Sequence, residues 1–173
     1  MTATATPEFS RRVPLARLGP APFRQDIAAS EDERRALARR FGLVALDRLC
    51  AAVELIHQGR DMVLLRAAFE AEFVQSCVIT LDPVAGAVSQ RFALIYGPPD
   101  KEEVAGGIVG DEVAFQPLDG PAIDIGEAVA QEFSLALPPF PRRSDASVDT
   151  EMPAQDGGPF AALSRLVTRR GGM

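Results

Sequence analysis

The chain has 173 residues and a net charge of −6, which allow one domain with a substantial core and argue against a uniformly basic nucleic-acid binder. Its two cysteines are too few for a disulfide scaffold, and the N-terminus MTATATPEF lacks the basic and apolar regions of a signal peptide. No apolar run reaches the roughly 18 residues that span a bilayer, so we expect a cytoplasmic protein.

The N-terminal part predicts two short strands followed by a helix. The stretches 9–17 and 22–27 have strand character and are separated by a Gly-Pro pair that indicates a turn. The next stretch, SEDERRALARRFG, predicts a helix over 31–41. Ser30 with a glutamate three residues later has the spacing of a capping box, and Gly42 stands where a left-handed C-cap is expected.

From Leu43 to Tyr96 the apolar residues follow a period of two, with turns at Gly59 and at DPVAG (82–86). This pattern predicts a three-stranded antiparallel meander that is covered on one side. The residues expected on the covered face are Leu49, Ala51, Val53, Leu55, Phe69, Ala71, Phe73, Val88, Phe92, Leu94 and Tyr96.

A second helix follows a loop. Residues 97–121 are rich in Gly, Pro and acidic side chains and predict a loop with one short strand at 112–116. Asp124 then has the position of an N-cap, Glu127 lies at the third helical position, and Pro138 ends the helix. We therefore expect an α+β domain over 1–140, an antiparallel meander packed by two helices, with partial closure into a barrel left open.

The C-terminal region predicts a flexible linker over 141–158 and a short amphipathic helix within 159–173. One face of that helix carries Phe160, Leu163 and Val167. The helix either docks into a groove of a partner or packs back on its own domain.

The chain has few residues of the kinds that catalysis and metal binding require. A structural zinc site needs four ligands, and the chain offers two cysteines and His57, so Cys77 is best interpreted as a small apolar residue at a strand end. His57 has no Asp or Asn at a motif distance. Asp119, Asp124 and Glu127 are candidates for Mg²⁺, but the last two already have a role at the helix start. We predict no catalytic site, metal or cofactor.

Charge is unevenly distributed along the chain. Residues 1–60 carry ten arginines against seven acidic residues, whereas residues 61–135 carry three basic and thirteen acidic groups. The candidate RNA contacts on the first helix are Arg34, Arg35, Arg39 and Arg40. These arginines either bind phosphates or pair with glutamates of the same helix. The acidic middle either holds a basic protein or is an ordinary solvated surface.

Three stretches of the chain resemble the YceD family, the proteins named for large ribosomal RNA subunit accumulation, in the form found in alphaproteobacteria. They are FVQSCVITLDPV (73–84), AIDIGEAVAQEFSLALPPFPR (122–142) and PFAALSRL (159–166). Many family members have two C-x-x-C pairs that suggest a metal clip. Here Cys77 aligns with the first cysteine, Thr80 replaces the second, and PFPRRSDA (139–146) contains none. The resemblance implies a variant without the metal, in which Asp82 and Pro83 shape the turn.

The resemblance implies a non-enzymatic function. Such a protein would support accumulation of large-subunit ribosomal RNA by binding that RNA, a precursor particle or a basic ribosomal protein. An interaction module with a non-ribosomal partner is the alternative, and an RNA-processing nuclease is a third. The sequence features of a ribosome binder and of an unrelated module are the same.

Overall fold

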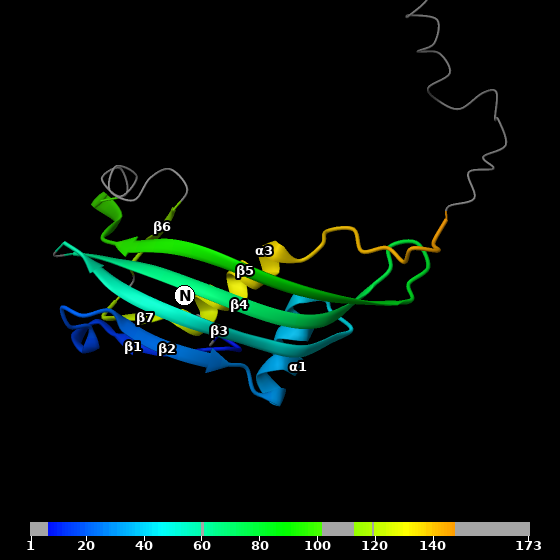
Figure 1. The fold of residues 1–173 in the computed structure, drawn as a ribbon, viewed down its shortest axis with the longest axis horizontal. Helices are drawn as coiled ribbons and strands as arrows, with labels where there is room; N and C mark the ends of the chain where they lie inside the picture. Colours follow the sequence, from blue (N-terminus) through cyan, green and yellow to red (C-terminus); the bar gives the residue numbers. More distant parts are fainter. Residues whose placement is uncertain (1–6, 60, 102–112, 119, 148–173) are drawn as a thin grey trace, which may run out of the picture. The chain divides into compact units, whose positions relative to one another are not determined.

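The structure is a computed structural model that describes residues 7–59, 61–101, 113–118 and 120–147. The strands among these residues are β1 (Arg12–Pro14), β2 (Phe23–Ala28), β3 (Ala45–Gln58), β4 (Met62–Ser76), β5 (Pro83–Gly97), β6 (Ala114–Pro117) and β7 (Ala122–Asp124). The helices are α1 (Glu31–Phe41) and α3 (Ile125–Ala136), with short 3₁₀ helices η1 (Leu15–Arg17) and η2 (Pro99–Lys101). The described residues up to Arg143 form one compact unit, in which α1 and α3 lie on the same side of the main sheet (Figure 1).

Helix α1 begins and ends at the predicted residues. The Ser30 hydroxyl accepts a hydrogen bond from the Glu33 N–H, and the Glu33 carboxylate accepts one from the Ser30 N–H, which completes the capping box. Gly42 follows the helix with φ of 66°, the left-handed conformation that terminates helices and favours glycine. These local interactions explain why the sequence alone located this helix.

The predicted meander is confirmed. Strands β3, β4 and β5 pair antiparallel over most of their length, and their alternate residues are buried on the side of the helices. The second turn lies earlier than predicted, because Cys77–Asp82 form the turn and β5 already begins at Pro83. Gly86 belongs to the strand, where the Phe73 ring covers it so closely that an added Cβ would lie 2.7 Å from a ring atom. The glycine in DPVAG therefore serves aromatic packing rather than the turn.

The main sheet has the order β2-β3-β4-β5-β6 and is open rather than closed into a barrel. Strand β6 pairs parallel with β5, so the sheet is mixed, and this strand starts two residues later than predicted. The α+β class is confirmed, with α1 and α3 as the α-helices of the described residues. The parallel pairing was not expected, because a four-residue strand gives no period from which direction can be inferred.

A second, two-stranded sheet joins the N-terminus to the start of α3. Strand β1 pairs antiparallel with β7, which places Arg12 opposite Asp124. The predicted strand 9–17 is therefore shortened to three residues followed by η1, and β7, between the predicted loop and the second helix, was not predicted. Strands of three residues are too short for alternation to be visible in the sequence.

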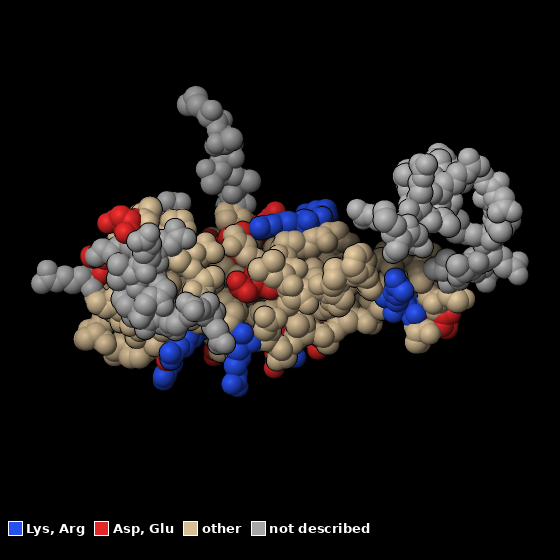
Figure 2. All heavy atoms as spheres, turned by 90° about the horizontal axis from the view of Figure 1, so that it is seen from above, with Lys and Arg blue, Asp and Glu red and all other residues tan. Residues whose placement is uncertain are grey.

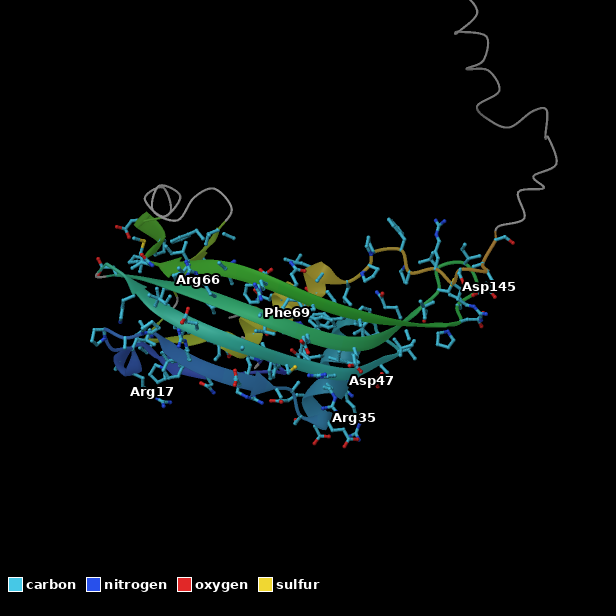
Figure 3. The ribbon with its side chains drawn as sticks, viewed as in Figure 1. Arg17, Arg35, Asp47, Arg66, Phe69 and Asp145 are labelled. Atoms are coloured by element: carbon cyan, nitrogen blue, oxygen red, sulfur yellow. The ribbon has the colours of Figure 1, made fainter. Side chains whose placement is uncertain are left out.

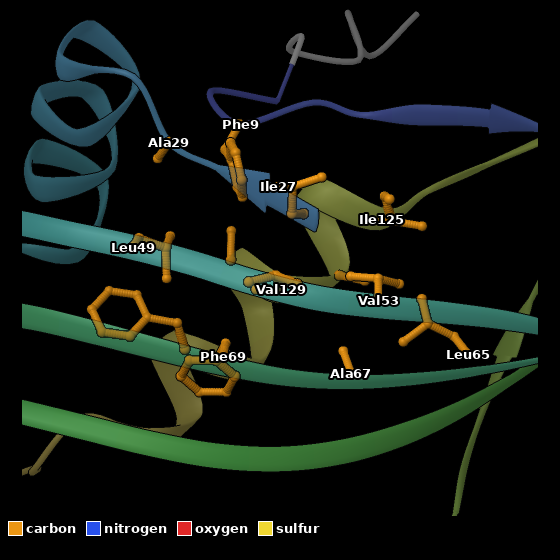
Figure 4. Close-up of a cluster of buried hydrophobic side chains, with 14 of the residues drawn as sticks. Phe9, Ile27, Ala29, Leu49, Val53, Leu65, Ala67, Phe69, Ile125 and Val129 are labelled. Carbon is orange, nitrogen blue, oxygen red and sulfur yellow. The ribbon is translucent and has the colours of Figure 1, made fainter. Parts of the chain in front are cut away.

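The core lies between the main sheet and the two helices (Figure 4). Its fully buried members include Phe9 from the N-terminal segment, Leu37 from α1, Phe69 from β4 and Phe133 from α3. The Phe133 ring makes edge-to-face contacts with the rings of Phe41, Phe69 and Phe73, at centroid distances of 5.9, 6.4 and 5.7 Å. Phe133 therefore connects α3 to both α1 and β4.

Candidate functional site

Arg40, one of the predicted RNA contacts, connects three parts of the fold. Its guanidinium forms ion pairs with Glu8 at 2.9 Å and with Glu127 at 2.8 Å. Hydrogen bonding to Glu127 raises the pKa of Arg40 further above its usual range, and the bond to Glu8 acts in the same direction. Arg40 thus links α1 to the first turn of α3 and to the N-terminal segment.

The other three arginines of α1 differ in their contacts. Arg35 forms ion pairs with Glu31 and Asp32 of its own helix, and Arg34 donates a hydrogen bond to the Ala29 carbonyl at 2.8 Å. The Arg39 side chain forms no hydrogen bond or ion pair with the part of the chain that the structure describes. An RNA contact by this helix stays a prediction, and Arg39 is the arginine that would make it without giving up an internal bond.

Asp124 holds the start of α3 against the N-terminal segment. Its carboxylate accepts hydrogen bonds from the Gly126 and Glu127 N–H groups at 3.1 and 3.2 Å, as an N-cap does. The same carboxylate accepts from the Arg11 N–H at 2.7 Å and from the Ser10 hydroxyl. The segment passes so close to the helix that a Cβ on Gly126 would lie 2.4 Å from the Phe9 carbonyl oxygen. Asp124 has a structural role in this arrangement, as does Glu127 through Arg40.

The turn between β4 and β5 packs against the chain that follows α3. The Cys77 N–H donates to the Asp82 carbonyl at 2.8 Å, and the Val78 N–H donates to the Pro141 carbonyl at 2.9 Å. The side chain of Asp82 lies 3.3 Å from the guanidinium of Arg143. On the neighbouring strand, the Gln75 side chain donates to the carbonyl of Pro138, two residues past the end of α3. The first residues of the predicted linker, 141–143, therefore contact this turn.

The Cys77 thiol is completely buried at this junction. A hydrogen bond from the Thr80 hydroxyl, with further bonds from the backbone N–H groups of Thr80, Arg143 and Ile79, lowers the pKa of Cys77 to about 6. Donors therefore already surround the sulfur. Because the described residues contain no cluster of three or more His, Cys, Asp or Glu side chains placed to hold a metal ion, these residues do not fit a metal clip. Thr80, which stands where many family members have the second cysteine, instead donates a hydrogen bond to the sulfur of Cys77.

We expect the thiolate of Cys77 to contribute stability that depends on pH. A cysteine whose pKa is about 6 when folded and near 8.5 when unfolded stabilises the fold fully above the higher value and loses this effect as the pH falls through 6. Replacing Thr80 by Val removes the leading donor, so Thr80→Val should lower the free energy of unfolding more at pH 8.5 than at pH 5.5. Urea unfolding at both pH values measures the difference.

The control for this prediction is Cys50→Ser, which removes the other free thiol and leaves Cys77 as the one that titrates. In this background thiolate absorbance should rise with a midpoint near pH 6 in the folded protein and shift upward in Thr80→Val. A midpoint above pH 8 before the second substitution would contradict the assignment.

His57 lies far from Cys77, because β3 places it opposite Val63 at the other end of β4. Its Nε2 is 3.3 Å from the Leu18 carbonyl oxygen. The structure therefore does not bring these two residues together. Asp119 and the predicted docking residues Phe160, Leu163 and Val167 lie outside the described residues.

One surface that was not predicted from the sequence is the face of the main sheet opposite the helices. Its alternate residues on β2, β3 and β4 include Ala28, Ala52 and Ala68, which are exposed, and Cys50, which is half-buried. They line a hollow of about 920 Å³ that also borders Arg91 of β5. We call this hollow the alanine trough. The signal was present in the period-two pattern, which places alanine at positions where an exposed strand usually carries longer polar residues.

The fold and these surfaces define a small α+β domain whose main sheet is covered by helices on one face and carries the alanine trough on the other. A family model described as "Large ribosomal RNA subunit accumulation protein YceD" matches residues 65–163, more than half of the chain. The protein belongs to the YceD family. No curated protein and no solved structure matched the chain. None of the helices described is both long and apolar enough to cross a membrane.

Proposed function

We propose that this protein is a binding factor, without a chemical step of its own, that large-subunit ribosomal RNA requires in order to accumulate. The match of residues 65–163 to the YceD family is the observation that carries the proposal. The contacts of the side chains that could take part in catalysis or metal binding support this proposal. Asp124 and Glu127 hold the start of α3, and Cys77 is buried at a turn. The partner would be the ribosomal RNA, a precursor particle or a basic ribosomal protein, in the cytoplasm.

Depletion of the protein in its own cells tests this proposal. We expect the ratio of large-subunit to small-subunit ribosomal RNA to fall, with large-subunit precursors changed and small-subunit precursors unchanged. The intact chain, supplied again from a plasmid, is the control and should restore the ratio. An unchanged ratio in depleted cells would remove the ribosomal function and leave a module with another partner.

The absence of a chemical step needs its own measurement. Purified full-length protein, incubated with precursor ribosomal RNA and Mg²⁺, is expected to leave the RNA intact. Cleavage that persists through further purification would show that the protein is a nuclease.

A further inference from the structure

The alanine trough is a surface of the described unit on which small apolar side chains are exposed although the fold itself places nothing described against them. One row of residues crosses four neighbouring strands there, from Asp26 on β2 through Ala52 and Ala68 to Arg91 on β5. Three strand spacings of about 4.8 Å separate the two ends of the row by about 14 Å. An α-helix with side chains is roughly 10–12 Å across, so the floor between Asp26 and Arg91 has the width of one helix.

Alanine is an unfavourable residue for exposed strands, where β-branched and aromatic residues are enriched. Small side chains are favourable where another backbone must approach closely. The opposite face of this sheet already carries α1 and α3, whose apolar residues fill the core. A helix in the trough would cover the second face and bury the alanines, as in proteins with helices on both sides of one sheet.

The charges around the trough are balanced rather than basic. The charged residues at paired positions on this face of the described strands are Arg24, Asp26, Arg48, Glu54, Arg66, Glu70, Glu72 and Arg91, and Asp47 is exposed beside Glu72 in the bulge of β3. Arg24 pairs with Glu54 at 2.7 Å, and Arg48 lies 3.2 Å from Glu70 and 3.8 Å from Glu72. Phosphate binding needs concentrated positive charge, so this face does not favour RNA.

Aromatic side chains point away from the trough as well. Phe69 is the aromatic residue that borders the trough, and its ring lies on the other face of the sheet, where it contacts the Phe92 ring at a centroid distance of 6.1 Å. Figure 3 shows Arg66 and Phe69 on the same strand, three residues apart and therefore on opposite faces. The trough itself therefore offers no aromatic platform on which bases could stack. Phe115 of β6 lies on the same face of the sheet, but outside the trough, where it packs half-buried against Met62 and Ile95. Figure 2 views another side of the molecule, where basic side chains also stand apart, with neutral and acidic surface between them.

Three charged residues remain without an ion pair among the described residues. Asp26 on β2 and Arg91 on β5 lie on opposite sides of the alanine floor. Arg66 lies two residues from Ala68 along β4, at one end of the floor, and is the diagonal neighbour of Arg91. A ligand that complements them carries an acidic group toward the two arginines and a basic group toward Asp26. Both requirements are met by one helix with opposite charges along its two flanks and an apolar strip between them.

We propose that the alanine trough docks an amphipathic α-helix of a partner protein, with an acidic side chain bound by Arg66 and Arg91 and a basic one by Asp26. This inference rests on the proposed function, in which the protein acts by binding. It selects protein rather than RNA as the occupant of this face. Contact with RNA elsewhere, for example through Arg39, is compatible with it.

Photo-crosslinking in growing cells tests the docking. The full-length chain is produced with p-benzoylphenylalanine in place of Ala52, and a control carries it in place of Asp32, which is exposed on α1. We expect position 52, and not position 32, to crosslink to one protein segment, identified by mass spectrometry. A synthetic peptide of that segment should be helical when bound and carry acidic and basic residues on opposite flanks.

Binding of that peptide to the purified chain provides the second measurement. The double variant Arg66→Glu/Arg91→Glu should weaken the affinity at least tenfold. The matched double variant Arg12→Glu/Arg39→Glu, with the same change in charge away from the trough, should leave it within twofold. Equal weakening by the two variants would overturn the proposal, as would crosslinking at position 52 to RNA, to another copy of this chain or to its own residues, or no crosslink above the control.

Failure of this inference can be distinguished from failure of the proposed function. Ala52→Trp fills the trough on an exposed face and should leave folding intact, which thermal unfolding verifies. If depletion lowers large-subunit RNA and Ala52→Trp restores it fully, the trough is not the binding surface while the function stands. If depletion has no effect on the RNA, the function itself is wrong.

Discussion

Replacing Phe133 by Ala is expected to destabilise the domain by about 3–5 kcal/mol, the range for truncating a buried aromatic side chain. Phe133 is fully buried, and its ring contacts Phe41 of α1 and two rings of β4. The substitution therefore removes apolar contacts between three elements and leaves a cavity where they meet. Since whole domains are stable by only about 5–15 kcal/mol, the loss is a large fraction of the total. Urea unfolding followed by circular dichroism measures it.

The matched control for this prediction is Leu135→Ala in the same helix. Leu135 is 78% exposed, so its truncation should change the free energy of unfolding by no more than about 0.5 kcal/mol. Similar effects of the two substitutions would show that the orientation of α3 differs from the one described.

Asp124→Ala is expected to destabilise the domain by about 2–4 kcal/mol. Loss of an N-cap costs about 0.5–2 kcal/mol, and a hydrogen bond to a charged group contributes about 1.5–3 kcal/mol. Here one carboxylate caps α3 and also accepts from Ser10 and from the Arg11 N–H, so both effects fall on one side chain. Amide exchange should quicken at Arg11 and in the first turn of α3, because these N–H groups lose their acceptor.

Two substitutions bracket the Asp124 prediction. Asp124→Asn keeps one acceptor oxygen without the charge and should lie between the wild type and Asp124→Ala. Asp32→Ala removes an acid that is 92% exposed and paired with Arg35, and should cost less than about 1 kcal/mol. If Asp124→Ala were as mild as Asp32→Ala, the carboxylate would not hold the N-terminal segment to α3.

The candidate site was predicted from the sequence only in part. The cap at Asp124 was identified correctly because an N-cap depends on residues that are neighbours in the chain. The second set of bonds to Asp124, from Ser10 and Arg11, spans more than a hundred residues and has no sequence signal. For Arg40 the sequence left RNA phosphates and glutamates of its own helix as alternative partners, whereas the structure pairs it with Glu8 and Glu127. Long side chains choose partners by tertiary proximity, which spacing does not reveal.

The same distinction applies to the whole protein. The sequence by itself determined both helices, with their caps, and the period-two strands β3, β4 and β5, because hydrogen bonding within one turn and alternate burial leave a local pattern. Only the tertiary structure decided that β6 runs parallel, that β1 pairs with β7, and that exposed alanines of separate strands form one trough. Each of these depends on contacts between residues distant in the chain, where the energy comes from packing and not from the residues' own conformational preference.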